Sequence, residues 1–485
     1  MKYYIILFLS AVCAISAQNS IPKILDNLLE ANGEIYLIHP SSKEKIKASN
    51  NNPKYKLMHF TDCIQGSSTG IIFDFRNNKL DGSIAWGFYP FDDAKASYPV
   101  YFKNTAKIKD GKAQIDILKE ISKKHDIPNF LSNGKFKFGY RVIDESGNII
   151  YDGKAFFKGK GPFELVLSIT DGPFINQVTH NSAVISFKTN YKKITKVKIN
   201  NKIYSDSFPT RQHEFAINDL KPNENYEYEI ILPDYSEKYQ FKTAPKPGSR
   251  TEFKFAFASD CRQGQGGGER AIWGVNSYIL KKAAALTNFM NTAFWQFTGD
   301  IIQGYLTDSQ ELRLQYANFK RTIEPYANRI PVYVGMGNHE AYVKHFPDDT
   351  FYGIALNAFP YKTNSSEAYF SDEFVNFENG PISEDGSIYD PDNTNDDFPP
   401  YKENVYHYSY DNLAMVVLNS NYLYTLDKNQ IPYLGGNLHG YVMDNQLEWF
   451  RKTIELYEND KNIDHIIVTI HTPAFPNAGH VSDDM

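Results

Sequence analysis

Residues 331–340 read PVYVGMGNHE, and residues 294–300 read FWQFTGD. In each stretch a short apolar run leads into a glycine that a polar residue follows. Such a run, bounded by turn residues, is typical of a buried strand. Glycine lets the backbone turn sharply where the strand ends. These two stretches therefore predict strands that each present a polar side chain at the carboxyl end.

Two further apolar runs end in the same way, at residues 253–258 before Asp260 and at residues 466–470 before His471. Helical patterns separate or follow the runs at residues 269–291, 308–328 and 444–458, as in a layered α/β domain. Ligands collect beyond the carboxyl ends of strands in α/β sheets, so we expect the four ends to meet. Each end alone would be an ordinary turn, and four in order favour a site.

The polar residues at these ends are of one chemical kind. Carboxylate, amide oxygen and imidazole form the ligand set of Mn, Fe or Zn. A carboxylate such as Asp300 can bridge two cations. Two cations together hold the attacking and the leaving oxygens of a phosphoryl displacement. The sequence therefore predicts a metal site suited to phosphoryl transfer.

These motifs resemble four of the five ordered motifs of the calcineurin-like metallophosphoesterases. They are Asp260, Gly299-Asp300, Gly337-Asn338-His339-Glu340 and Val468-Thr469-Ile470-His471. Residues 408–411, 446–449, 471–475 and 479–480, with a fibronectin-like segment in front, look like the purple acid phosphatase branch. The resemblance covers about residue 162 to the end. It implies hydrolysis of phosphate esters with a metal-bound hydroxide as the nucleophile.

The resemblance also implies roles for single residues. Asp260 would bind one metal, Asp300 would bridge both, and Asn338 and His471 would bind the second.

Two histidines are implied as catalytic groups. His339 would hydrogen-bond the phosphoryl oxygens, and His480 would orient the phosphate or protonate the leaving oxygen. Both suit this work because the ordinary pKa of histidine lies near the operating range.

The chain departs from the family at two positions near the first metal. Gln303 stands where purple enzymes have a tyrosine, and Arg262 stands where other branches have a histidine. Gln303 or Cys261 is then left to supply the extra ligand, with Tyr305 as a shifted alternative. Arg262 matches two phosphate oxygens with its planar fork, unless it is an ordinary surface arginine. Without a phenolate, the site should prefer divalent ions, so we expect two metal ions among divalent Fe, Mn or Zn.

The family's last motif, Gly-His-x-His, does not occur in the sequence, and residues 479–482 do not fit it. We therefore expect the phosphatase domain to be incomplete at its C-terminus.

The pattern along the chain predicts a multidomain protein. We expect a signal peptide at residues 1–17, a mostly-β domain of unknown role at 18–161, a fibronectin type III-like β-sandwich at 162–247, and an α/β metallophosphatase domain at 248–485, a layered β-sandwich flanked by helices. A hairpin is predicted around residues 145–148. The stretch from Leu220 to Tyr228 resembles the leucine-proline-tyrosine corner of fibronectin type III domains.

Composition narrows the location and the partners. The signal-like start predicts a secreted or periplasmic protein, with a lipid anchor at Cys13 as the less favoured alternative. The formal net charge is -6, so no general positive field would hold a nucleic acid. No later apolar run approaches the length of a membrane span. Cys63 and Cys261 fall in different predicted domains, which argues against a disulfide framework.

Three functions stay open from the sequence. The first is an acid phosphatase-like phosphomonoesterase, and the second is a phosphodiesterase that uses the same site. The third is a non-catalytic binding or adhesion protein with a degenerate phosphatase module. A phosphate ester is the expected substrate of either enzyme, and the sequence names neither the natural substrate nor a partner protein.

Overall fold

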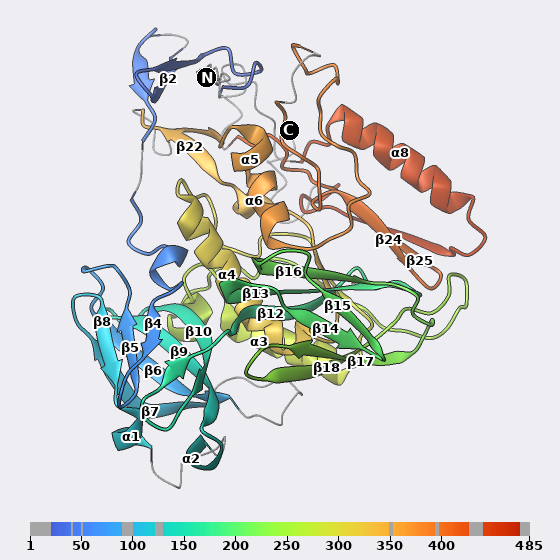
Figure 1. Cartoon of the computed structure of the whole chain (residues 1–485). Coiled ribbons are helices and arrows are strands. Elements are labelled where there is room, and N and C mark those ends of the chain that lie inside the picture. The colour runs from blue at the N-terminus through green and yellow to red at the C-terminus, as the bar shows by residue number, and fades with distance from the viewer. Residues whose placement is uncertain are drawn as a thin grey trace, which may run out of the picture.

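The computed structural model describes residues 21–39, 42–49, 52–89, 100–121, 130–348, 353–392, 397–425 and 440–475. The architecture is mostly β, with several sheets, few helices and more than one body (Figure 1). The predicted signal peptide and His480 lie outside the described residues. Among the described residues, no helix is long and apolar enough to cross a membrane.

Two sheets form the N-terminal body. The five-stranded sheet has the order β11-β10-β9-β6-β7, and the three-stranded sheet has the order β4-β5-β8. Their bounds are β4 Ile64–Gly66, β5 Ile71–Asp74, β6 Gly82–Tyr89, β7 Val100–Ile108, β8 Lys112–Ile115, β9 Lys135–Asp144, β10 Ile149–Lys158 and β11 Glu164–Leu165. Short helices flank them: η1 Leu57–His59, α1 Ile117–Glu120 and α2 Phe130–Asn133. The predicted hairpin is present as the antiparallel pair β9 and β10.

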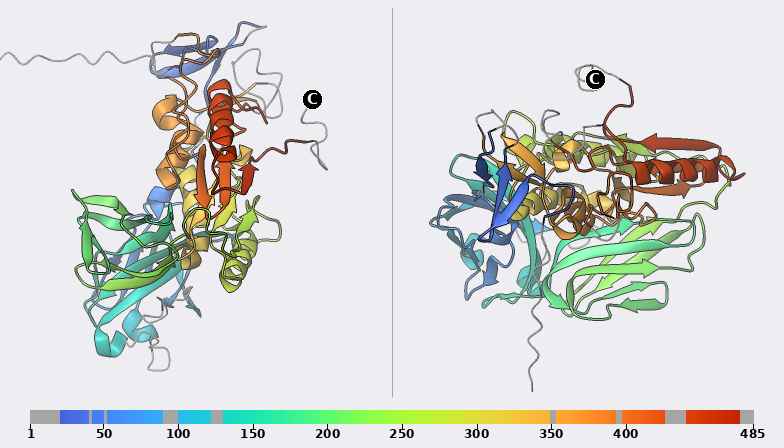
Figure 2. Two further views of the ribbon diagram at one scale, coloured as in Figure 1. Left: turned by 90° about the vertical axis from the view of Figure 1, so that its right-hand side faces the viewer. Right: turned by 90° about the horizontal axis from the view of Figure 1, so that it is seen from above.

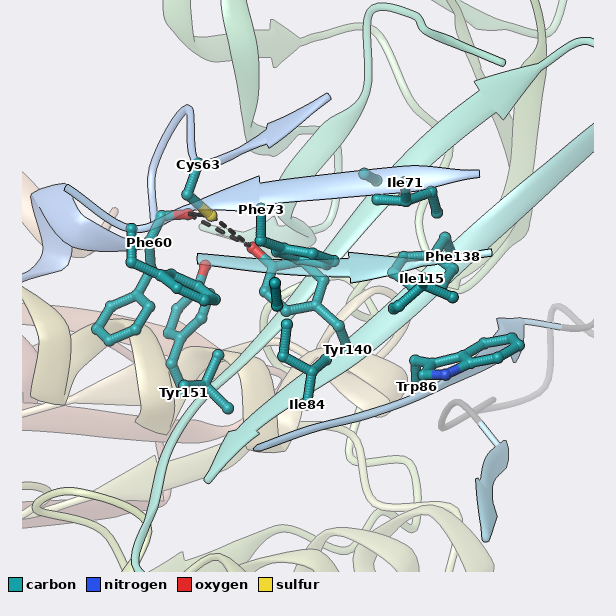
Figure 3. Packing of buried hydrophobic residues seen from close by; sticks show 14 of the residues in the cluster. Phe60, Cys63, Ile71, Phe73, Ile84, Trp86, Ile115, Phe138, Tyr140 and Tyr151 are labelled. Carbon is teal, nitrogen blue, oxygen red and sulfur yellow. Dashed lines mark hydrogen bonds between the residues drawn. The ribbon is translucent and has the colours of Figure 1, made fainter. Parts of the chain in front are cut away.

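The core of this body is rich in aromatic rings (Figure 3). Phe73 packs edge-on against Tyr140, with ring centroids 5.1 Å apart. The Cys63 thiol donates to the carbonyl of Phe60 at 3.2 Å and lies 3.7 Å from the Tyr140 hydroxyl. Burial raises the pKa of Cys63 to about 12, so this free cysteine is a packing residue.

A β-sandwich follows, with sheet orders β12-β13-β16 and β15-β14-β17-β18. Its strands are β12 Ile169–Asn176, β13 Ala183–Lys193, β14 Lys196–Ile199, β15 Lys202–Ser205, β16 Thr210–Ile217, β17 Asn225–Ile231 and β18 Ser236–Lys242. At the predicted corner, the N–H of Lys221 donates to the Tyr226 hydroxyl at 2.7 Å. A tyrosine hydroxyl bonded to backbone a few residues upstream is typical of such corners.

The third body carries two further three-stranded sheets, β19-β20-β21, which is all parallel, and β24-β25-β26. Their strands are β19 Ala256–Ala258, β20 Trp295–Phe297, β21 Val332–Val334, β24 Tyr406–Tyr410, β25 Leu413–Val417 and β26 His465–Thr469. All four predicted apolar runs thus contain a strand: β19, β20, β21 and β26. Figures 1 and 2 place most of this body above the sandwich and the N-terminal sheets.

The helices of the third body are η3 Gly268–Ala271, α3 Ser277–Phe289, α4 Ser309–Ala327, η4 Asn338–Glu340, α5 Tyr361–Asn364, α6 Ser366–Glu373 and α8 Asp444–Glu458. The helix expected over residues 269–291 is shorter than predicted. Asn276 caps α3 by accepting the N–H of Ile279, and positive φ angles at Gly266, Gly267 and Gly268 keep the preceding loop out of the helix.

The first described strands do not pack with the N-terminal sheets. β1 Leu28–Ala31, β2 Glu34–Ile38 and β3 Lys45–Lys47 form a small sheet. Leu37, from β2, is buried in a cluster with Phe346 and Ile354 of the β22 Val343–Phe346 and β23 Ile354–Asn357 pair. The third body therefore includes residues from the chain's beginning, and the boundaries at 161 and 247 stay predictions.

Candidate metal centre

Three predicted ligands meet at the ends of their strands. One ligand atom from each of Asp260, Asp300 and His471 lies within 4.8 Å of the other two. Asp260 follows β19, Asp300 follows β20, and His471 follows β26 of the other sheet. The structure thus brings together side chains separated by up to 211 positions in the sequence.

Left-handed backbone aims the two carboxylates. Asp260 has φ 55° and Asp300 has φ 52°, in the region that non-glycine residues seldom adopt. Gly299 precedes Asp300 with φ 108°, and a Cβ there would lie 2.2 Å from the N atom of Gly337. Strained backbone held in place by its surroundings is common at functional sites.

The imidazole of His471 fits a cation at this point. Its Nδ1 lies 3.0 Å from the carbonyl oxygen of Thr298, which fixes the proton on Nδ1. The Nε2 atom then faces Asn338 Oδ1 at 3.1 Å and Asp300 Oδ1 at 3.2 Å. Three acceptor atoms facing one another need a second ring proton or a cation between them. Asn338 Oδ1 therefore lies beside the group of Asp260, Asp300 and His471, where it could serve the same cation.

Glu340 ties two of the strand ends together. It is fully buried, and its carboxylate accepts the N–H groups of Asp300 at 2.9 Å, Ile301 at 2.9 Å and Gly337 at 2.5 Å. Burial, with the nearby charge of Asp300, raises the pKa of Glu340 to about 8. Glu340 is part of the sequence motif, but this role was not predicted, because two of the three N–H groups come from the end of a separate strand.

The two ring nitrogens of His339 have different partners, Gln303 and Arg262. Its Nδ1 lies 2.6 Å from the carbonyl oxygen of Gln303, so Nδ1 donates. Its Nε2 contacts Nη1 of Arg262 and lies 3.9 Å from Asp300 Oδ2. Burial lowers the pKa of His339 despite the charge of Asp300. Arg262, with 41% of its side chain exposed, has its Nε 3.9 Å from the same carboxylate oxygen of Asp300.

Three candidates for the extra ligand lie in different places. Gln303 is exposed and contributes its main-chain carbonyl to His339. Cys261 is buried in an apolar cluster, where its thiol donates to the carbonyl of Ile301 and burial raises its pKa well above the usual value. The Tyr305 hydroxyl instead accepts from Asn338 Nδ2.

Tyr305 reaches the site through an unusual loop. Gly304 has φ 57°, and Tyr305 itself has φ 53°. The Tyr305 ring packs edge-on against His339 with centroids 4.5 Å apart. This contact with His339 was not predicted from the sequence; glycine at position 304 permits the turn that makes it.

The arrangement offers two kinds of chemistry. The oxygens and the imidazole nitrogen can hold cations, and the guanidinium of Arg262 with the imidazole of His339 forms a polar wall beside them. Such a wall can contact the oxygens of a tetrahedral anion.

No protein-family model matches the chain, and no curated protein matches it. Among solved structures, the chain is similar to "Structure of PhoD" at 15% identity and a TM-score of 0.39, over 61% of each chain. The chain thus spans less than two thirds of that protein. It is similar to the "Central Fibronectin-III array of RIM-binding protein" at 13% identity and a TM-score of 0.20, over 40% of this chain and 76% of that one. A Bacteroides uniformis beta-glucuronidase is similar at 10% identity and a TM-score of 0.22, over 54% of this chain and 38% of that one. Likeness at this level identifies no family.

Proposed function

We propose that this protein is a metal-dependent phosphoesterase with a dinuclear site. The observation that carries the proposal is the convergence of Asp260, Asp300 and His471, with Asn338 Oδ1 3.1 Å from the His471 imidazole. In the proposed assignment, Asp260 would hold one metal, Asp300 would serve both, and Asn338 and His471 would hold the other. Gln303 keeps only a supporting role, through the carbonyl oxygen that orients His339.

Bound cations would supply Lewis acidity toward the phosphoryl group and an activated water. The chain's own residues orient the substrate. One N–H group of Arg262 contacts His339 Nε2, and its Nε lies 3.9 Å from Asp300 Oδ2, so its remaining N–H groups would meet phosphoryl oxygens as charge develops. His339 holds that guanidinium at the edge of the site.

A phosphomonoesterase of the acid phosphatase type is the first choice, since Arg262 adds a positive group where a monoester carries its extra charge. A phosphodiesterase is the second choice. We further propose that the protein acts outside the cytoplasm after removal of residues 1–17, with the sandwich as a fibronectin type III-like domain. His480 stays a proposed catalytic group.

The test measures metal content and hydrolysis together. The full chain, loaded separately with Mn, Zn or ferrous iron, is given an aryl phosphomonoester and an aryl phosphodiester. Asp300→Asn should lose bound metal and activity. The matched control is Asp219→Asn, because Asp219 also has a left-handed backbone, at φ 62°, but lies exposed in the sandwich.

The outcomes separate the three functions. Faster turnover of the monoester supports the phosphatase, and faster turnover of the diester supports the alternative enzyme. Metal binding without turnover of either ester indicates the non-catalytic binding protein. Full metal content in Asp300→Asn contradicts the assignment of that residue.

A further inference from the structure

We propose that Arg141, in the N-terminal sheet, is a positioning residue for Arg262 at the metal centre and acts through Glu269. The inference rests on the proposed function, in which Arg262 contacts the phosphoryl group. It gives the N-terminal body a part in the reaction, although that body carries none of the proposed metal ligands.

Arg141 is itself rigidly held. It lies on β9, and its Nε and Nη2 atoms donate to the two carboxylate oxygens of Asp152 on β10, at 2.7 and 2.6 Å. Both side chains are nearly buried. A two-pronged pair of this kind fixes the plane of the guanidinium as well as its position. The same Nη2 lies 2.8 Å from Glu269 Oε1.

Glu269 contacts a second cation, which belongs to the third body. Lys281, on α3, places its Nζ 2.7 Å from the same Oε1. Burial alone would raise the pKa of Glu269, but the hydrogen bond from Lys281 and the charges of Lys281 and Arg141 outweigh it and hold the pKa below its usual value. The carboxylate thus joins the N-terminal sheet to the third body.

Glu269 belongs to the excursion that carries Arg262. Arg262 pairs with Val275 at the base of this excursion, and the N–H of Gln263 donates to the carbonyl of Gly274 at 3.1 Å. At the tip, the N–H of Gly264 donates to the carbonyl of Arg270 at 2.7 Å. The residue next to Glu269 is therefore bonded to the residue two positions after Arg262.

The glycines of the tip contribute little packing, although Arg270 beside them stacks on Tyr278 of α3, 4.6 Å from the ring centroid. Gly267 and Gly268 have positive φ angles, and a Cβ on either would meet no atom within 4 Å. A glycine-rich segment loses more conformational entropy on ordering than other sequences do. The charged contacts of Glu269 offset that cost. When the tip is fixed, the side chain of Arg262 can adopt fewer positions, and it stays beside His339 and Asp300.

A second anchor on the same body lies further along the excursion. The N–H of Trp273 donates to the carbonyl of Ile149 at 3.2 Å, and its ring packs edge-on against Tyr55 with centroids 4.7 Å apart. The excursion is therefore held at both Glu269 and Trp273, and removal of the Arg141 contact alone should loosen its tip without releasing the whole segment.

The experiment is a double-mutant cycle on the metal-loaded full chain. Glu269→Gln should lower kcat/KM for an aryl phosphomonoester by about three- to tenfold, the range for one partly buried charged contact. The loss should lie mainly in KM and leave metal content unchanged. In an Arg262→Ala background, Glu269→Gln should cause no further loss, because its effect passes through Arg262.

Two variants on the sheet side complete the cycle. Arg141→Met should lower kcat/KM at least as far as Glu269→Gln, because it also removes the two-pronged partner of Asp152, and Arg141→Lys should recover part of the loss, since a lysine keeps the charge but not the fork. The matched control is Lys137→Met, which removes a comparable ion pair from the same strand, 2.7 Å to Glu237, that does not touch the excursion. Lys137→Met should leave kcat/KM unchanged.

Amide hydrogen exchange provides a readout that does not depend on activity. In Glu269→Gln, the N–H groups of Gln263 and Gly264 should exchange faster, with exchange in β9 and α3 unchanged. Additive losses with Arg262→Ala, or unaltered exchange at Gly264, would overturn the proposal. If the wild-type chain hydrolyses neither ester, the proposed function fails on its own, and the exchange result still decides whether Arg141 and Glu269 hold the tip.

Discussion

The carboxylate of Glu340 accepts the main-chain N–H of Asp300 at 2.9 Å, which couples the end of β20 to the turn after β21. Glu340→Gln would replace one acceptor oxygen with an NH2 group. That NH2 group would face main-chain N–H groups, so donor would meet donor. We expect the free energy of unfolding to fall by about 1–3 kcal/mol and the metal content to fall with it. Urea unfolding and metal analysis measure both. The control is Glu367→Gln, another fully buried glutamate, which should keep its metals. Unchanged metal affinity in Glu340→Gln would show that the coupling does not position Asp300.

Gly304→Ala should disrupt the site by steric overlap. A Cβ at Gly304 would lie 1.3 Å from the carbonyl oxygen of His339, and φ is 57° there. The left-handed backbone alone costs about 1–3 kcal/mol in such positions, and the overlap adds to it. Gly147→Ala serves as the control, because Gly147 has φ 83° but open space around its Cα. The Tm of thermal unfolding and the metal content should both fall much further in Gly304→Ala than in Gly147→Ala. Equal effects of the two variants would mean that the overlap relaxes at no cost.

His339→Ala should keep the metals and lose rate. His339 contacts Arg262 and is not among the proposed ligands, so its loss removes one group beside the reacting phosphoryl. Loss of one transition-state contact lowers kcat by about 10²–10³. Metal content measured beside the kinetics distinguishes this result from the loss of both expected in Asp300→Asn. A metal-free His339→Ala protein would move His339 into the ligand set.

The iron-loaded, oxidised protein should show no strong visible band. By the sequence resemblance, Gln303 would stand where purple acid phosphatases have their tyrosine ligand, and the Tyr305 hydroxyl contacts Asn338 Nδ2. An absorption spectrum decides this. A strong visible band in the wild type that disappeared in Tyr305→Phe would show that the phenol ligates the metal after all.

Stability should depend on pH through Glu403. Burial raises the pKa of Glu403 to about 8, although Lys402 opposes the shift, and Glu378 and Glu214 reinforce it. Because the folded-state pKa lies above the ordinary value, the stabilisation from the neutral carboxyl is complete below about pH 4.5. It is lost as the pH rises through about 8.

In Glu403→Gln this component of the pH dependence should disappear, so the variant should gain stability relative to the wild type between about pH 5 and 8.5. Urea midpoints across that range measure the difference. Parallel curves for the two proteins would place the pKa of Glu403 near its ordinary value.

The sequence by itself determined the strands of the site and the polar residues that follow them. Apolar runs followed by glycine are local signals, and they correctly predicted β20 and β21, with Asp300 and Asn338 after them. The hairpin of β9 and β10 was equally local. The predicted start of α3 at residue 269 was wrong, because the helix begins at Ser277 after the cap at Asn276.

Only the tertiary structure decided which segments meet. Arg141 and Glu269 are in contact although 128 positions separate them in the sequence. Leu37 and Phe346 lie in one buried cluster although 309 positions separate them. Hydrophobic periodicity predicts helices and strands, but it does not predict such pairs. The pairs form only when the separate bodies pack against one another. The contacts of Glu340 with the N–H groups of Asp300 and Ile301 have the same origin, because the two strand ends meet only in the folded chain, where a buried carboxylate without hydrogen-bond partners would cost free energy.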